Sequence, residues 1–364
     1  MTKGKAAVME RPREIAVKEF DLPDVGPSEG LLKVEAAGLC VSDSKRYDDL
    51  YKVPVLPLIM GHENVGMVYR IGGELATATG LKVGDRVALE AAIPCGLCRY
   101  CTQGESRFCQ KRRSYGVNMP ANQPPYLWGG YAQFMYLTKG IITKKISLEV
   151  SPEACVLFSP LSNGIYWVRT LGDCRIGDNV VIQGPGPQGL CAAIAAREAG
   201  AATIIVTGLD RDGERLELAK QFGATHCIDV SQVDLISAVK DITGGNMADL
   251  VVDVSGSSAA LQNSLELVRK GGTILSGGLT GTDTRTPLLV DKITLGQIRL
   301  QGCFSSDSRC KDTAIKLLES KKYPVERMVT HRYPLERIEE ALDAVGGHDK
   351  QVYPIKAVIS PWTN

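Results

Sequence analysis

Four of the eleven cysteines fall within fifteen residues, as Cys95, Cys98, Cys101 and Cys109 in the pattern C-x2-C-x2-C-x7-C. In a cytosolic chain, clustering of this kind indicates a bound metal rather than disulfides. Four thiolates around Zn²⁺ close a tetrahedron and leave no position for a substrate. The pattern therefore predicts a structural zinc site that holds an otherwise irregular segment, about residues 94–112, in place.

Two further segments carry residue types that could bind a metal or move a proton: GLCVSD at 38–43 and GHE at 61–63. A cysteine and a histidine 22 residues apart are a weak signal for a metal site. Buried cysteines are common in protein cores without any metal, and histidines are found there too. The residues alone therefore leave open whether Cys40 and His62 are metal ligands or core residues.

A glycine-rich turn, GPGPQG, follows the apolar segment NVVIQ and opens an apolar helix. Its glycines, Gly184, Gly186 and Gly189, have the spacing of a dinucleotide-binding fingerprint. The first allows the tight turn, the second lets the backbone approach a pyrophosphate, and the third lets helix and strand pack closely. With Pro187 and Gln188 at the start of the helix, the segment predicts a site for a nicotinamide dinucleotide with its phosphates at the helix N-terminus.

The choice between NAD and NADP stays open at the next strand, which ends IIVTGLDRDGER. An acidic residue at this strand end binds the ribose 2′-hydroxyl of NAD, whereas a nearby arginine accommodates a 2′-phosphate. Position 208 is a glycine, and Gly208 with Arg211 and Arg215 favours NADP. Asp210 and Asp212 favour NAD.

The elements that must position these residues change character near residue 160. Before it, short strands with Gly-Asp turns predict a compact, β-rich, barrel-like domain. Between 160 and 300, apolar strands alternate with helices, which predicts a parallel doubly wound sheet. After 300 a strand, two helices and a final strand follow, and we expect this tail to return to the first domain.

The boundary itself reads VLFSPLSNG. Serine is a favoured helix N-cap and proline is favoured at the first helical position. Apolar residues then recur at helical spacing as far as Gly172. The segment predicts a helix over 160–171 that Ser159 caps and Gly172 closes.

Composition excludes several classes of protein. The 364 residues suggest about two domains, and 44% hydrophobic with 23% charged residues is typical of a soluble globular chain. The net charge of +1 gives no field for nucleic acid. No apolar run approaches the ~20 residues that span a bilayer, and the N-terminus has no apolar signal core. We therefore expect a cytoplasmic protein without nucleic-acid or membrane partners.

Taken in order, GLCVSD, GHE, the four-cysteine segment, GPGPQG, DVSGSS and GGTILSGG resemble the medium-chain, zinc-dependent alcohol dehydrogenase superfamily over essentially the whole chain. The sorbitol and threonine dehydrogenase branches look closest, because GHE carries a glutamate. The resemblance implies an α/β fold in which a β-rich, GroES-like catalytic domain (1–159 and 301–364) carries an inserted Rossmann domain (160–300).

The resemblance implies that Cys40, His62 and Glu63 are ligands of a catalytic zinc. The family's third ligand, an anionic side chain, aligns with Ser159, which is neutral. Three alternatives remain. Glu63 and water complete the site, zinc is absent or labile, or another residue, Ser159 included, coordinates the metal.

The resemblance also assigns roles beside the metal. Ser42 matches the hydroxyl that contacts the substrate alcohol and begins removal of its proton. Asp43 matches a carboxylate that orients the histidine ligand. Lys45 stands where the family often has a histidine in its proton relay, so its part in that relay is left open.

The expected activity is reversible hydride transfer between a secondary or polyol-like alcohol and NAD(P)⁺, which yields a ketone or an aldehyde. One alternative is a zinc-free or zinc-poor reductase of activated double bonds on the same fold. Another is a nucleotide-binding or structural protein that has lost catalysis. The implied partners are a small alcohol or ketone and further copies of the chain, as a homodimer or homotetramer.

Overall fold

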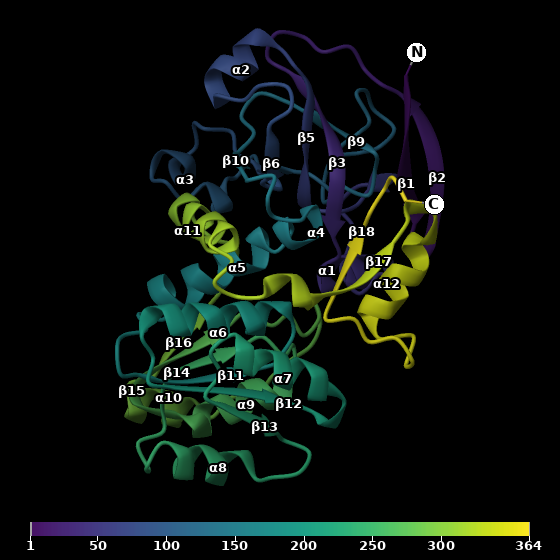
Figure 1. Ribbon diagram of the computed structural model, residues 1–364. Coiled ribbons are helices and arrows are strands. Elements are labelled where there is room, and N and C mark those ends of the chain that lie inside the picture. Colours follow the sequence, from purple (N-terminus) through teal and green to yellow (C-terminus); the bar gives the residue numbers. More distant parts are fainter. Residues whose placement is uncertain (1, 364) are drawn as a thin grey trace. The chain divides into compact units, whose positions relative to one another are not determined.

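The computed structural model describes residues 2–363 and divides into two compact units (Figure 1). The first unit comprises Met1–Phe158, Leu318–Ser320 and Met328–Asn364, and the second comprises Ser159–Leu317 and Lys321–Arg327. The return to the first unit therefore comes later than the expected residue 301. The segment after 300 stays with the second unit because Ser305 O accepts a hydrogen bond from Trp167 Nε1 at 2.9 Å and Tyr323 OH donates one to Glu198 Oε1 at 2.5 Å.

Strand pairing in the first unit is mainly antiparallel, although β17 and β18 pair in parallel. Its larger sheet has the order β10-β6-β5-β3-β18-β17, with β9 also pairing β3, and its smaller sheet has the order β2-β1-β4. The strands are β1 (Lys3–Arg11), β2 (Glu14–Asp21), β3 (Gly30–Gly38), β4 (Leu58–Ile59), β5 (Glu63–Ile71), β6 (Arg86–Leu89), β7 (Ala92–Ile93), β8 (Arg113–Ser114), β9 (Phe134–Leu137), β10 (Thr143–Lys145), β17 (Val329–Tyr333) and β18 (Lys356–Ile359). The C-terminal strand β18 thus lies beside β3 in the centre of the sheet, where Val358 pairs with Gly38.

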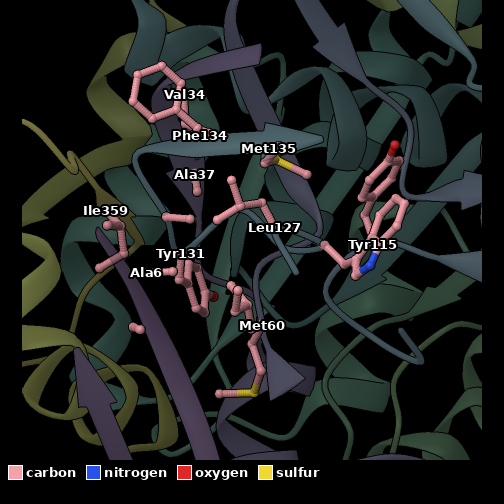
Figure 2. Close-up of a cluster of buried hydrophobic side chains, with 14 of the residues drawn as sticks. Ala6, Val34, Ala37, Met60, Tyr115, Leu127, Tyr131, Phe134, Met135 and Ile359 are labelled. Atoms are coloured by element: carbon pink, nitrogen blue, oxygen red, sulfur yellow. The ribbon is translucent and has the colours of Figure 1, made fainter. Parts of the chain in front are cut away.

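The helices of the first unit are short. They are α1 (Val41–Tyr47), α2 (Gly73–Thr79), α3 (Arg99–Thr102), α4 (Pro152–Cys155) and α12 (Ile338–Gly346), with 3₁₀ turns η1 (Ser106–Phe108), η4 (Val325–Met328, which spans the unit boundary) and η5 (Leu335–Arg337). Buried apolar side chains of the first unit form one hydrophobic core. Figure 2 shows part of it, with Val34 of β3, Met135 of β9 and Ile359 of β18 around Tyr131.

The second unit contains one parallel sheet in the order β13-β12-β11-β14-β15-β16. The strands are β11 (Asn179–Gln183), β12 (Thr203–Gly208), β13 (His226–Asp229), β14 (Ala248–Asp253), β15 (Val268–Ser276) and β16 (Arg299–Gly302). The helical segments are α5 (Phe158–Ile165), η2 (Tyr166–Leu171), α6 (Pro187–Ala199), η3 (Asp210–Asp212), α7 (Gly213–Gln221), α8 (Leu235–Ile242), α9 (Ser258–Leu267), α10 (Val290–Gly296) and α11 (Ser308–Glu319), of which α5 and α11 cross the unit boundary at one end. The predicted doubly wound sheet is therefore confirmed, and the order of the strands reverses between β11 and β14, which are adjacent.

The predicted helix cap at Ser159 is wrong. Helix α5 begins at Phe158, so Ser159 lies inside its first turn. The reason lies upstream, since Val156 already has right-handed helical angles (φ −62°, ψ −21°). The N-cap of this region is Ser151, whose Oγ accepts from Ala154 N at 3.2 Å at the start of α4.

The far end of the predicted helix also differs. The α-helical pattern stops at Ile165 and continues as a π-helix to Leu171. Gly172 N donates to Trp167 O, five residues earlier, at 2.7 Å, so Gly172 does end the segment. A π-helical turn inserts one residue into the helical repeat, which the spacing of apolar residues does not reveal.

None of the helices within residues 2–363 combines the length and apolar character needed to cross a membrane.

Candidate active site and zinc sites

The first candidate site lies where β3 and β5 run side by side in the first unit. The register pairs Gly38 with Glu63, so the residues after the end of β3 face those at the start of β5. Cys40, His62 and Glu63 each bring one ligand atom to within 4.8 Å of the others. Sheet register, rather than proximity in sequence, therefore joins the two segments.

Asp43 orients the histidine of this group. Its carboxylate is fully buried in helix α1, and Oδ1 lies 3.1 Å from His62 Nδ1. Oδ2 accepts from Tyr131 OH at 2.9 Å and from Cys40 N at 3.3 Å. Because Nδ1 is engaged, Nε2 is the ring nitrogen left for a metal. Burial alone would raise the pKa of Asp43, but the charge and hydrogen bond of His62 outweigh it and lower that pKa.

The surroundings favour the thiolate of Cys40, which binds a cation, whereas His62 must lose a proton before it can bind one. Burial opposes ionisation of the Cys40 thiol, but the hydrogen bond and charge of His62 lower its pKa. Burial also opposes protonation of His62, yet the charge of Asp43 raises the pKa of the ring well above its usual value. A thiolate is the form of cysteine that binds zinc, so the donor set of thiolate, imidazole and carboxylate fits this metal.

Lys356 is a member of the site that sequence reasoning missed. Its Nζ forms an ion pair with Glu63 Oε2 and donates to Leu39 O at 2.9 Å, and both side chains are almost fully buried. Burial alone would lower the pKa of Lys356, but the charge of Glu63 raises it. The available signal was a single lysine within the otherwise apolar strand segment IKAVIS, since a lysine in such a place needs a partner.

The predicted proton-transfer residues share helix α1 with Asp43. Ser42 is half-buried, and its Oγ accepts from Arg46 Nη1 at 3.3 Å. The Lys45 ammonium lies 5.4 Å from the centre of the Tyr51 ring. Burial lowers the pKa of Lys45, against the opposing charge of Cys40.

The second candidate site is the loop between β7 and β8, whose ends pair as a two-stranded ribbon. All four sulfur atoms of Cys95, Cys98, Cys101 and Cys109 lie within 4.8 Å of one another. The sulfurs of Cys98 and Cys101 are 3.6 Å apart, close to the edge of about 3.8 Å expected for a tetrahedron with Zn–S bonds of about 2.3 Å. Backbone N–H groups of Cys101 and Gln110 lower the pKa of Cys98 to about 6, so this loop stabilises a thiolate at Cys98, whereas burial and the neighbouring Cys98 raise the pKa of Cys101 to about 12.

The absence of disulfides among the described cysteines leaves the four sulfur atoms of this loop available to a metal. Each of the eleven cysteines, all within the described residues, is a free thiol.

The glycine fingerprint in the second unit has the geometry of a phosphate cradle. Gly184 has φ +104°, and a Cβ there would lie 2.9 Å from Ser255 Cα. A Cβ on Gly189 would overlap Gly184 O. By contrast, Gly186, the N-cap of α6, has open space around it, and Pro187 begins the helix. The turn is therefore tight at its first and third glycines and open at its second, where a phosphate would approach the backbone.

Gln188, unlike the open Gly186, has its side chain held by hydrogen bonds to α5. Its Nε2 donates to Pro160 O at 3.2 Å, and its Oε1 accepts from Asn163 Nδ2 at 3.4 Å. These contacts join α6 to α5 within the second unit.

Four of the charged residues that follow the strand end at Gly208 differ in burial and in their partners. Asp212 is buried, accepts from Leu209 N at 3.0 Å and pairs with Arg215 Nη1 at 3.1 Å. Asp210 is exposed two residues beyond β12, with its Oδ1 accepting from the N–H of the equally exposed Arg211 at 2.8 Å. Arg215 is thus engaged by Asp212, and Asp210 presents its carboxylate at the strand end.

Comparison with known proteins extends the assignment along the chain. Residues 26–147 match the alcohol dehydrogenase GroES-like domain, and residues 187–320 match the zinc-binding dehydrogenase domain. A probable alcohol dehydrogenase of Mycobacterium tuberculosis is 37% identical over 98% of both chains. A sorbitol dehydrogenase of Bacillus subtilis is 34% identical over 93% of this chain and 92% of its own.

A solved structure shows the same architecture. The crystal structure of an alcohol dehydrogenase from Thermotoga maritima superposes with a TM-score of 0.90 at 27% identity and covers 99% of this chain and 100% of its own. None of these three relatives is named for reduction of double bonds. The GroES-like and doubly wound α/β fold is confirmed, and the chain is an alcohol dehydrogenase that interconverts alcohols and carbonyl compounds. It belongs to the medium-chain, zinc-dependent alcohol dehydrogenase superfamily.

Proposed function

We propose that this enzyme oxidises a secondary or polyol-like alcohol with a nicotinamide dinucleotide and a catalytic zinc held by Cys40, His62 and Glu63. The observation that carries the proposal is the convergence of these three ligand atoms, with Asp43 behind the histidine. Zinc bound there supplies a Lewis acid for the substrate oxygen, and the nicotinamide accepts the hydride. Since Ser159 is neutral, Glu63 is the anionic oxygen ligand in this proposal.

The chain's own residues handle the proton. Ser42 Oγ, in the first turn of α1, would accept the hydroxyl proton of the substrate while its own hydroxyl proton passes outward toward solvent. Lys45 lies one turn further along the same helix, and its lowered pKa lets it exchange a proton more readily than an exposed lysine. Asp43 holds His62 in the tautomer that leaves Nε2 free for the metal.

The test combines metal content with activity. Wild type is expected to hold two zinc ions per chain, one at the four cysteines and one at this site, and to oxidise alcohols with NAD(P)⁺. Cys40→Ala should keep only the zinc of the four cysteines and lose the activity. Full alcohol oxidation by a Cys40→Ala protein that lacks the second zinc would refute the proposal.

We further propose that the cofactor is NAD⁺ rather than NADP⁺. Asp210 offers an exposed carboxylate 21 residues after Gly189, where a ribose 2′-hydroxyl would be bound, whereas Arg215 is engaged by Asp212. Asp210→Ala should lower kcat/KM for NAD⁺ about 10–100-fold and leave that for NADP⁺ unchanged or higher, on the scale of a charged hydrogen bond. A preference for NADP⁺ in wild type would contradict this choice.

We also propose an oligomeric state and a location for the enzyme. Strand β16 forms an edge of its sheet, and Leu295, Leu300 and Phe304 are exposed near it, which favours a homodimer or homotetramer. Free thiols throughout favour a cytoplasmic location. Light scattering in solution measures the first, and a monomer at micromolar concentration would contradict it.

A further inference from the structure

The ion pair of Lys356 and Glu63 is the most deeply buried pair of opposite charges beside the candidate active site. The side chains are 3% and 7% exposed. Lys356 lies at the start of β18, and its ammonium also donates to Leu39 O, the carbonyl that directly precedes Cys40. The pair therefore joins the C-terminal strand to both segments that carry the metal ligands.

Glu63 is thus within reach of two different cations. Its Oε2 is held by Lys356, and one of its carboxylate oxygens lies within 4.8 Å of the ligand atoms of Cys40 and His62. A buried carboxylate that loses its counter-charge is strongly destabilised, because water no longer solvates it. Because the Lys356 ammonium and a zinc ion would share this one carboxylate, each would weaken the interaction of the other with Glu63.

The backbone leaves this arrangement little freedom. A Cβ built on Gly38 would overlap Glu63 Oε2 and would lie 3.0 Å from Lys356 Cε and 3.1 Å from its Nζ. Both side chains pack directly over the bare Cα of this residue. Only glycine at the end of β3 lets the pair occupy this position.

We propose that Lys356 is a positioning residue that sets how tightly zinc is held by Cys40, His62 and Glu63, because it restrains the Glu63 carboxylate through Oε2. This inference rests on the proposed function, in which Glu63 is a zinc ligand. Restraint of one oxygen weakens Glu63 as a ligand and makes the zinc exchangeable. The effect is large in this chain because Ser159 supplies no negative charge.

The experiment measures zinc affinity and exchange in the full-length, zinc-loaded enzyme. A chelator competition gives the dissociation constant, and loss of ⁶⁵Zn to excess unlabelled Zn²⁺ gives the exchange rate. Cys40→Ser, which should keep only the zinc of the four cysteines, supplies the baseline to subtract. Lys356→Met removes the ammonium, and Lys356→Arg keeps its charge.

Lys356→Met should bind this zinc about 10–100-fold more tightly than wild type and exchange it correspondingly more slowly, because the buried Glu63 carboxylate loses its competing counter-charge. Lys356→Arg should stay close to wild type. Glu63→Gln should bind zinc about 10–100-fold more weakly. In the Glu63→Gln background, adding Lys356→Met should no longer change the affinity, since the lysine acts through the carboxylate.

Gly38→Ala provides a second variant if Lys356→Met does not fold. The added methyl group displaces the ion pair without removing a charge, so Gly38→Ala should shift the zinc dissociation constant. Gly73→Ala, at a glycine with open space around it, is the control and should leave the zinc dissociation constant unchanged.

Three results would overturn the inference. The first is an unchanged exchange rate in Lys356→Met and Gly38→Ala with two zinc ions per chain, which leaves the proposed function intact. The second is an equal effect of Lys356→Met with and without Glu63, which would make the lysine a remote charge only. The third is a single zinc in wild type, which removes the proposed function as well.

Discussion

Replacing Asp43 with asparagine tests the reasoning about the active site most directly. The two side chains have the same shape, but the amide brings an N–H₂ group where the carboxylate only accepts hydrogen bonds. In the enzyme, Oδ1 faces His62 Nδ1 and Arg46 Nη1, and Oδ2 faces Tyr131 OH and Cys40 N. Either orientation of the amide therefore points one donor at a fixed donor.

The orientation with the amide nitrogen toward His62 changes the tautomer of the ring. Nδ1 must then accept, so the ring proton moves to Nε2, the nitrogen proposed to bind zinc. We expect a loss of zinc affinity of about 10–100-fold, or about 1.4–2.7 kcal/mol, because partners of histidine ligands have effects of this size. Activity at limiting zinc should fall in parallel.

Tyr131→Phe is the matched control, because it removes one hydrogen bond to Oδ2 and leaves the charge of Asp43 in place. It should cost about 1 kcal/mol of unfolding free energy and leave zinc affinity within a few-fold. The assay is chelator competition on each purified variant, with thermal melts as the folding check. If Asp43→Asn bound zinc as tightly as wild type, the account of how His62 is oriented would be refuted.

Three other perturbations have definite expected outcomes. Cys98→Ser should lose one zinc per chain and lower Tm, while the second zinc stays; equal metal content in mutant and wild type would contradict a four-cysteine site. Arg86 makes a bidentate pair with the half-buried Glu35 at 2.7 and 2.9 Å, so Arg86→Met should reduce the free energy of unfolding by about 2 kcal/mol in urea titrations, and a loss below about 0.5 kcal/mol would contradict this expectation. Burial alone would raise the pKa of Glu198, but the hydrogen bond from Lys322 helps to lower it, so Glu198 stabilises the fold at neutral pH. That contribution is lost as the pH falls from about 4.3 through the lower folded-state pKa, and Glu198→Gln should flatten this part of the Tm–pH curve.

Features that depend on neighbours in sequence were predictable. The glycine turn and the four cysteines each lie within a segment short enough for the spacing to determine the geometry. Asp43 could be expected near Cys40, since both lie at the start of one helix. The parallel sheet was also predictable, because strands that alternate with helices along the chain form a parallel sheet.

Features that depend on distant contacts were not predictable. Tyr131 reaches Asp43 across 88 residues, and Lys356 reaches Glu63 across 293. Nothing near Glu63 in the sequence indicates that a lysine from the last strand neutralises it. The prediction of a cap at Ser159 failed for a local reason. An N-cap residue must itself be extended, and here the chain is already helical at Val156 and Ser159 lies inside α5.

The place of β18 has a consequence for the order in which the enzyme matures. The four cysteines lie within fifteen residues, so this loop can take up metal soon after it leaves the ribosome. Glu63 also emerges early, but its ammonium partner belongs to a strand that is translated 293 residues later. Until that strand docks beside β3, Lys356 cannot neutralise the nascent carboxylate, and the group of Cys40, His62 and Glu63 reaches its final electrostatic state only after synthesis of β18 is complete.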